Sequence, residues 1–251
     1  MAEPEPAVRI VDREDYRAAR VAFLRRLIDP ASARGLEIGA FDLPTVLPEH
    51  GACEFADWRS TDELVAMFAV PRETIAPITH VVARGRALSE QITTRYDYVI
   101  ACHVLEHTPD PIAFLGDAGR LVRPGGIVFL AVPDKRRTAD AGRPSTTLDE
   151  LLERHHAGVT EPPLAQIMQF ARAWLPGFDR CSLRELHDFA VRNLASGLAD
   201  PHCNVWQDEE LFAQLEELIA NGFLPDLELA ACGPNDPAFN EFHVALRRKA
   251  A

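Results

Sequence analysis

The sequence lacks the long apolar runs that mark membrane proteins and secreted precursors. No stretch of about 18 or more apolar residues occurs in its 251 residues, and a helix needs about that many to cross a bilayer. The opening segment, MAEPEPAVRIVDREDY, has no basic stretch followed by an apolar one, so it is unlike a secretory leader. We therefore expect a cytoplasmic protein with no membrane partner.

Cysteine is scarce, and its spacing does not indicate pairing. The five cysteines are odd in number and widely scattered, and none are spaced as Cys-x-x-Cys. Disulfide scaffolds and zinc ribbons depend on close, regular cysteine pairs, so both classes are disfavoured. We expect reduced thiols that pack as small apolar groups.

Basic residues are also in short supply. Lys and Arg total 26 against 38 Asp and Glu, which gives a formal net charge of -12. A surface with this balance repels phosphate backbones, so we expect a small-molecule substrate and no nucleic acid partner.

What the sequence does contain is an alternation of short apolar runs with helical patterns. Its hydrophobic content of 47% suits one sizeable core, and 251 residues lie near the upper limit for one domain. Alternation of this kind predicts a doubly wound α/β fold with a mainly parallel seven-stranded sheet and an antiparallel closing strand. The predicted strands are 35–40, 51–58, 79–83, 96–104, 126–133, 226–233 and 240–249. The predicted helices between and around them are 14–28, 61–68, 111–122 and 208–223.

The segment from 134 to 206 breaks this alternation, because it carries many charges and helical patterns but no clear strand. We interpret it as a helical insertion after the fifth strand, within a single domain that spans 1–251 and has a flexible start at 1–12. Since the chain leaves the fifth strand at the ligand-binding edge of the sheet, the insertion is expected to cover that edge.

Residues that follow the parallel strands are the first candidates for a site, because the carboxyl ends of such strands meet at one edge. The first strand leads into Glu37-Ile38-Gly39-Ala40-Phe41-Asp42, and the second ends at Asp57-Trp58. The third leads into Arg84-Gly85-Arg86-Ala87, and the fourth into Cys102-His103.

These strand ends resemble the class I S-adenosylmethionine (SAM) methyltransferase superfamily. LEIGA is similar to its first motif, Asp57 stands at its ribose-binding acid, and YDYVIACHVLEHTPDP with LVRPGGIVFLAVPD resembles its fourth and fifth strands. The resemblance covers about residues 33–135, and NEFHVALRR fits the last strand. Within the superfamily, the PDKR and HC-x-x-W elements resemble a bacterial group whose members often accompany glycosyltransferases.

The resemblance implies that SAM is the cofactor. Gly39 would let the backbone approach it, Asp57 would accept hydrogen bonds from the ribose diol, and Glu37 would organise either the loop or the cofactor's amino group. The cofactor-binding residues implied in this way are Glu37, Gly39, Ala40, Phe41, Asp57, Trp58, Arg86, Ala87, Cys102 and His103.

The first turn departs from the superfamily's G-x-G-x-G pattern. It reads Gly39-Ala40-Phe41-Asp42-Leu43, so two glycine positions carry large side chains. The loop must follow a different path, with Phe41 turned into the core or over the cofactor. The same departure disfavours a nicotinamide enzyme, since a dinucleotide pyrophosphate needs the close approach that G-x-G-x-x-G allows.

Methyl transfer from a sulfonium needs alignment, and a general base if the acceptor is a hydroxyl. Our first candidate for that base is His103 and our second is His202, with His107, Asp134 and Trp206 as substrate contacts. A packing role for His107 and a salt-bridge role for Asp134 remain open alternatives.

No metal site is expected from the sequence. His202-Cys203 could join Cys102 and His103 around zinc, but no recognised spacing supports this. His155 and His156, which lie among charged residues, are expected to be solvated.

The predicted function is transfer of a methyl group to an O or N atom of a small molecule or sugar-containing metabolite. The alternative is a catalytically inactive cofactor-binding or regulatory protein of the same fold. The sequence leaves the acceptor and the oligomeric state open, a homodimer included.

Overall fold

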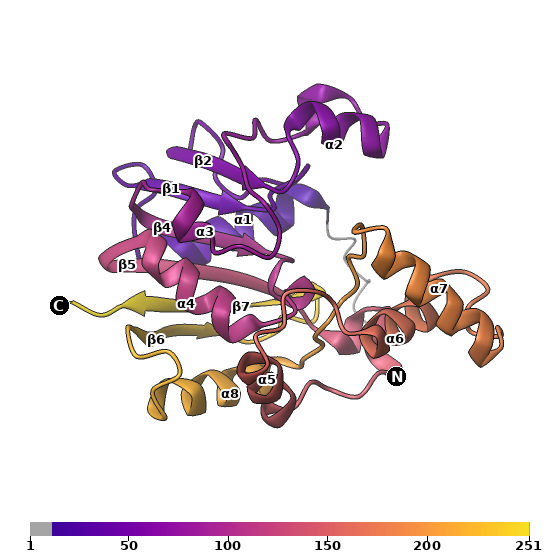
Figure 1. Cartoon of the computed structure of the whole chain (residues 1–251). Helices are drawn as coiled ribbons and strands as arrows, with labels where there is room; N and C mark the ends of the chain where they lie inside the picture. Colours follow the sequence, from indigo (N-terminus) through magenta and orange to yellow (C-terminus); the bar gives the residue numbers. More distant parts are fainter. Residues whose placement is uncertain (1–11, 251) are drawn as a thin grey trace, which may run out of the picture.

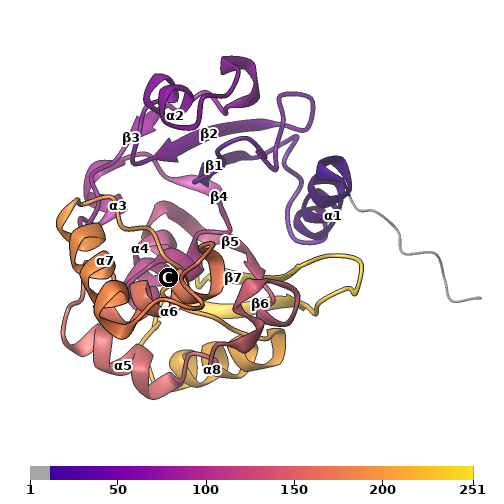
Figure 2. The same ribbon diagram turned by 90° about the vertical axis from the view of Figure 1, so that its right-hand side faces the viewer.

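The computed structural model describes residues 12–250, and its centre is a seven-stranded sheet with helices on both faces (Figures 1 and 2). The predicted flexible start at 1–12 lies almost entirely outside the described residues. The strands are β1 (Arg34–Ile38), β2 (Ala52–Asp57), β3 (His80–Val81), β4 (Tyr96–Cys102), β5 (Val122–Pro133), β6 (Leu227–Gly233) and β7 (Glu241–Arg248). The helices are α1 (Arg13–Arg25), α2 (Thr61–Phe68), α3 (Leu88–Gln91), α4 (Pro111–Leu121), α5 (Leu148–His156), α6 (Leu164–Trp174), α7 (Leu183–Ala195) and α8 (Asp208–Ala220).

The strand order is β3-β2-β1-β4-β5-β7-β6. The pairings from β3 to β5 are all parallel, whereas β7 runs antiparallel to both β5 and β6. The predicted doubly wound sheet with an antiparallel closing strand is therefore confirmed. The strand order reverses between β1 and β4, which is where an open sheet of this kind binds ligands.

Alternating side chains of β4 bury themselves on the two faces of the sheet. Tyr98 and Ile100 pack in one cluster with Phe23 and Leu24 of α1, while Val99 belongs to the larger cluster under α4 and α8. Figure 2 shows α1 on one side of the sheet and α4 and α8 on the other. The near-continuous apolar run of β4 is what a strand covered on both faces requires.

The predicted helical insertion follows β5 and contains α5, α6 and α7. Capping boxes begin α5 at Thr147 and α7 at Ser182. In each, the side chain of the cap residue accepts from the backbone N–H three residues later, and the glutamate at that later position accepts from the backbone N–H of the cap residue. Figure 1 places α6 and α7 beyond the carboxyl ends of the parallel strands.

The connection between β1 and β2 contains no helix and runs as loop and turns through residues 39–51. None of the helices between residues 12 and 250 is both long enough and apolar enough to cross a membrane.

Candidate functional site

A cavity of about 930 Å³ opens at the carboxyl ends of β1, β2 and β4. Its walls come from the turn after β1, the end of β2, the loop after β3, the turn after β4 and the first turns of α1. The insertion adds Thr160, Pro162, Ala199 and Asp200 to this lining. Segments distant in sequence thus meet at the edge where the parallel strands end.

Glu37, near the end of β1, fixes the turn that follows this strand. This carboxylate is fully buried and accepts hydrogen bonds from the backbone N–H of Thr45 (2.8 Å) and from its hydroxyl (2.8 Å). Burial raises the pKa of Glu37, against the lowering effect of these bonds. Glu37 does not line the cavity, so of its two expected roles the structure supports the organising of the loop, and its assignment as a cofactor contact is corrected.

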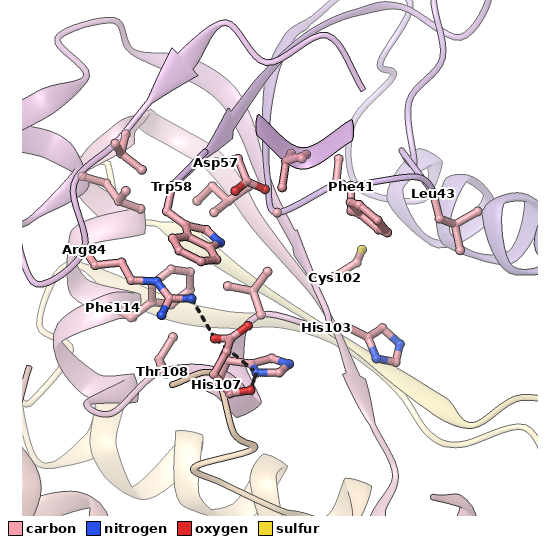
Figure 3. A pocket seen from close by; sticks show the side chains of 18 of the residues that line it. Phe41, Leu43, Asp57, Trp58, Arg84, Cys102, His103, His107, Thr108 and Phe114 are labelled. Carbon is pink, nitrogen blue, oxygen red and sulfur yellow. Dashed lines mark hydrogen bonds and ion pairs between the residues drawn. The ribbon is translucent and has the colours of Figure 1, made fainter. Parts of the chain in front are cut away.

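Gly39 and Phe41 show how the loop accommodates its unusual sequence. Gly39 has a φ of +68°, and a Cβ there would lie 2.8 Å from Cγ2 of Val104. Phe41 also has a positive φ, of 44°, and its ring packs on Phe68 of α2 with 4.6 Å between centroids. Both residues line the cavity, and Figure 3 shows the Phe41 ring there. Phe41 thus forms part of the wall and does not enter the core. The buried Ala40 also lines the cavity.

Asp57 ends β2 and faces the cavity with only 6% of its surface exposed. Burial raises the pKa of this carboxyl, opposed by hydrogen bonds from the backbone of Arg59 and Trp58. The bond from the N–H of Arg59 measures 3.2 Å, and a carboxylate has about four lone-pair positions, more than these two donors use. Asp57 therefore retains an acceptor for a ligand hydroxyl.

Trp58 and Arg84 form the neighbouring wall. The Arg84 guanidinium lies beside the Trp58 ring (Figure 3), with 3.7 Å between its central carbon and the ring centroid. Arg84 also donates to the carbonyl of Ala199 (3.0 Å) and to the carboxylate of Asp200 (3.0 Å). The loop after β3 is thus joined to the insertion across the rim of the cavity.

The residues after β3 that were predicted to bind the cofactor line the cavity only in part. Arg86 and Leu88 line the cavity, but Ala87 does not. The chain turns into α3 at this point, because Asp117 of α4 accepts from the backbone N–H groups of Leu88 and Ser89.

Cys102 and His103 both line the cavity at the end of β4. Burial raises the pKa of the Cys102 thiol to about 12, so this residue is not a thiolate at neutral pH. His103 has a φ of 54°, and its Nε2 lies 2.8 Å from Glu241.

Glu241, at the start of β7, is the centre of a buried polar network that our sequence analysis missed. Its carboxylate accepts two hydrogen bonds from Arg20 (2.9 and 2.6 Å), one from His103, and one from His243 (3.0 Å). Burial alone would raise the pKa of Glu241, but these donors hold it well below its ordinary value. The available signal was Glu241 at the head of a strand whose next five residues are mostly apolar.

Two predicted substrate contacts are corrected by the structure. Asp134 and Trp206 are both fully buried, and neither lines the cavity. The carboxylate of Asp134 pairs with Arg136, and the Trp206 indole donates to Gln214 (2.9 Å). Asp134 and Trp206 are the two ends of the insertion. The backbone N–H of Lys135, next to Asp134, donates to the carbonyl of Trp206 (2.9 Å) and joins these ends.

His107, which was predicted to contact the substrate, lines the cavity, whereas His202 does not. The two rings meet edge to face at 4.7 Å, and only 9% of His202 is exposed. His202 cannot reach an acceptor in the cavity, so its role as second candidate for the base is withdrawn. His156 is exposed as expected, but His155 pairs with Asp110 (2.9 Å).

Comparison with known proteins found a matching family model and several curated relatives. A family model described as "Methyltransferase domain" matches residues 12–218. Curated relatives include proteins named ubiquinone biosynthesis O-methyltransferase. The one from Photorhabdus laumondii is 33% identical over 38% of this chain and 41% of its own length. The one from Xanthomonas oryzae pv. oryzae is 30% identical over 51% of this chain and 52% of its own length. This chain therefore spans about half, or less, of these relatives.

Solved structures show the same fold at low identity. A SAM-dependent methyltransferase from Clostridium acetobutylicum superposes with a TM-score of 0.51 and 8% identity, covering 96% of this chain and 93% of that one. A protein described as a putative Zn-dependent alcohol dehydrogenase from Rhodobacter sphaeroides gives 0.53 and 17%, covering 97% and 92%. At these identities the likeness concerns the fold alone.

Proposed function

The chain belongs to the methyltransferase-domain family, and from that premise we propose that it transfers a methyl group from SAM to an oxygen or nitrogen atom of a small molecule. The family match agrees with the class I superfamily indicated by the strand ends. The observation that carries the proposal is that Gly39, Asp57 and His103 line the same cavity at the carboxyl edge of the sheet.

The cofactor is assigned along the strand ends. Asp57 accepts from the ribose hydroxyls, with the base on the side of Trp58 and Arg86 and the methionine portion between Gly39 and Cys102. A hydrogen bond to a charged group contributes about 1.5–3 kcal/mol, which makes Asp57 the most informative contact to remove.

Methyl transfer from SAM requires mainly that the protein align the reactants and exclude water. Together these effects can lower the activation barrier by about 7–11 kcal/mol. If the acceptor is a hydroxyl, His103 serves as the general base. Glu241 accepts the Nε2–H of His103, so Nδ1, which lies 3.5 Å from the Glu106 carboxylate, is the ring nitrogen that takes a proton. Glu241 is thus a positioning residue, itself held by Arg20 and His243.

A hydroxylated, partly apolar molecule is the acceptor class that the cavity favours. Drug-sized ligands occupy pockets of about 300–1,000 Å³, so 930 Å³ lies at the upper end of the range. Tyr16, Phe41, Phe68 and Phe114 give the lining large apolar surfaces. The O-methyltransferase names of the curated relatives support oxygen as the acceptor atom.

Single-turnover methyl transfer from labelled SAM to a panel of hydroxylated aromatic and sugar acceptors tests this proposal. The wild-type protein should methylate at least one acceptor. His103→Asn should lower the rate by about 10²–10⁴-fold while changing affinity for S-adenosylhomocysteine (SAH) little, since general-base catalysis has that magnitude. The exposed His156→Asn serves as the control and should react at the wild-type rate.

Two results would count against this account. SAH binding without turnover on any acceptor would favour the inactive cofactor-binding alternative. Full-rate transfer by His103→Asn would remove His103 as the base.

A further inference from the structure

A second cluster of reactive side chains lies in the wall of the cavity, where the insertion meets the turn after β4. Glu106, His107 and His202 each offer one ligand atom, and these atoms all lie within 4.8 Å of one another. Glu106 and His107 belong to the 3-10 turn Leu105–His107, whereas His202 comes from the segment that returns from α7. The backbone N–H of Asn204 donates to the carbonyl of Glu106 (3.0 Å) and holds the two segments together.

Glu106 is the unusual member, because its carboxylate is buried and lacks hydrogen bonds. Its side chain is only 1% exposed, and neither oxygen has a hydrogen-bond partner in the described chain. The nearest ring nitrogens are Nδ1 of His103 at 3.5 Å and Nε2 of His107 at 3.9 Å. A buried carboxylate without hydrogen bonds is costly, so a cation at this position would offset a clear penalty.

Both histidines of the cluster, His107 and His202, are oriented to offer a lone pair to an ion. Nδ1 of His202 lies 2.6 Å from Asp140, whose carboxylate is fixed by Arg143 (2.7 Å) and by the Trp174 indole (3.0 Å). Nδ1 of His107 lies 3.2 Å from the backbone carbonyl of Asp200. A ring that donates through Nδ1 keeps Nε2 as an acceptor, and metal-binding histidines are characteristically held by a carboxylate or carbonyl in this way.

We propose that Glu106, His107 and His202 bind one divalent transition-metal ion of the zinc class. Two imidazoles and one carboxylate are a typical ligand set for Zn²⁺ or Fe²⁺, and they leave at least one coordination position open. Ligand atoms at about 2.0–2.2 Å from one tetrahedral ion lie about 3.3–3.6 Å apart, so binding requires the cluster to contract from its present separations of up to 4.8 Å. His107, whose side chain is 27% exposed, is the ligand best able to move.

The site would connect the insertion to the sheet beside the cavity that His107 lines (Figure 3). This differs from the sequence-based expectation of no metal, which considered Cys102 and Cys203 as partners. Burial raises the pKa of both thiols to about 12, and neither belongs to the cluster. Metal binding needs neither cofactor nor acceptor, so it is independent of the methyl-transfer proposal.

The test is titration of tag-free, EDTA-treated full-length protein with Co²⁺, followed by visible absorption, and with Zn²⁺, followed by calorimetry and thermal melting. The wild type should bind one equivalent of either ion, show the d–d bands of Co²⁺ without a thiolate charge-transfer band, and melt at a higher temperature with Zn²⁺. Glu106→Gln and His202→Ala should each lose the bands and the thermal shift. Asp140→Asn should weaken affinity by about 10–100-fold, because it alters only the group that orients His202.

The matched control is His156→Ala, an exposed histidine on the same insertion, which should bind metal as the wild type does. Circular dichroism of each metal-free variant separates loss of ligands from loss of fold. The proposal is overturned if the folded wild type binds no ion, if a thiolate band dominates, or if folded Glu106→Gln and His202→Ala both retain wild-type affinity.

Discussion

At the scale of single residues, the most informative side chain is Glu241, because it connects the cavity to the core. A carboxylate that is 2% exposed is costly to bury, and here a bidentate arginine and two histidines offset that cost. Removing one partner of such a pair leaves the other charge buried and uncompensated. Glu241 should therefore affect both the stability of the protein and the orientation of His103.

The Glu241→Gln variant should be less stable than the wild type by about 3–5 kcal/mol at neutral pH, since it leaves Arg20 unpaired. The pKa of Glu241 is depressed on folding, so its contribution to stability is complete above its ordinary value of 4.5 and is lost as pH falls through the folded pKa. The difference between wild type and variant should be constant from pH 7 to about 5 and should shrink below 4.5.

Urea unfolding at a series of pH values measures this difference. Glu161→Gln, which removes an exposed acid on the insertion, is the matched control and should follow the wild type throughout. A difference that stays constant down to pH 3 would show that the buried pair does not carry the effect.

At the scale of elements, the connection from β1 to β2 is the part most closely shaped by the site. It has no helix, and it reaches the cavity through a glycine and a phenylalanine that both adopt positive φ. The buried Glu37 of β1 holds the middle of the connection through its hydrogen bonds with Thr45. The loop thus keeps a glycine at position 39, where a Cβ would press on Val104, although two of the usual glycines are absent.

Gly39→Ala tests whether that close approach matters. The left-handed conformation costs an L-residue about 1–2 kcal/mol, and the new Cβ would press on Val104 at 2.8 Å. We expect lower stability together with about tenfold weaker SAH binding, measured by calorimetry. Gly116→Ala in α4 meets no atom within 4 Å and should stabilise the protein by about 0.5–1 kcal/mol with unchanged SAH binding. Unchanged SAH affinity in Gly39→Ala would place the cofactor away from this turn.

Elements and their order were predictable from the sequence because apolar period and strand-end position depend on local pattern. The prediction of 61–68 as a helix matches α2 at both ends, and Asp57 and His103 lie on the cavity as expected. What failed was side-chain direction within the insertion. Asp134 follows β5 at the correct edge, yet its carboxylate turns to Arg136, and no sequence pattern shows which way a loop side chain points.

Contacts between residues far apart in the chain could not be predicted from the sequence either. The Glu241 network and the Glu106 cluster each join residues about a hundred or more positions apart, so spacing rules cannot reveal them.

At the scale of the whole molecule, acidic charge should decide which partners approach. With a formal net charge of -12, the protein should not bind RNA or DNA even at about 50 mM salt, where phosphate attraction is strongest. Fluorescence anisotropy with labelled single- and double-stranded oligonucleotides measures this at micromolar protein. Salt-dependent binding would reopen nucleic acid as the acceptor.

The central claim is that the cavity at the ends of β1, β2 and β4 holds a SAM-type cofactor, and titration of SAH into the whole protein by calorimetry tests it most directly. We predict saturable binding of one SAH per chain, weakened at least about tenfold in Asp57→Ala, as expected for a lost bond of about 1.5–3 kcal/mol. Asp62→Ala, which removes an exposed acid on α2, should bind like the wild type. An absence of SAH binding by the folded wild type, or equal affinity in Asp57→Ala, would contradict the account.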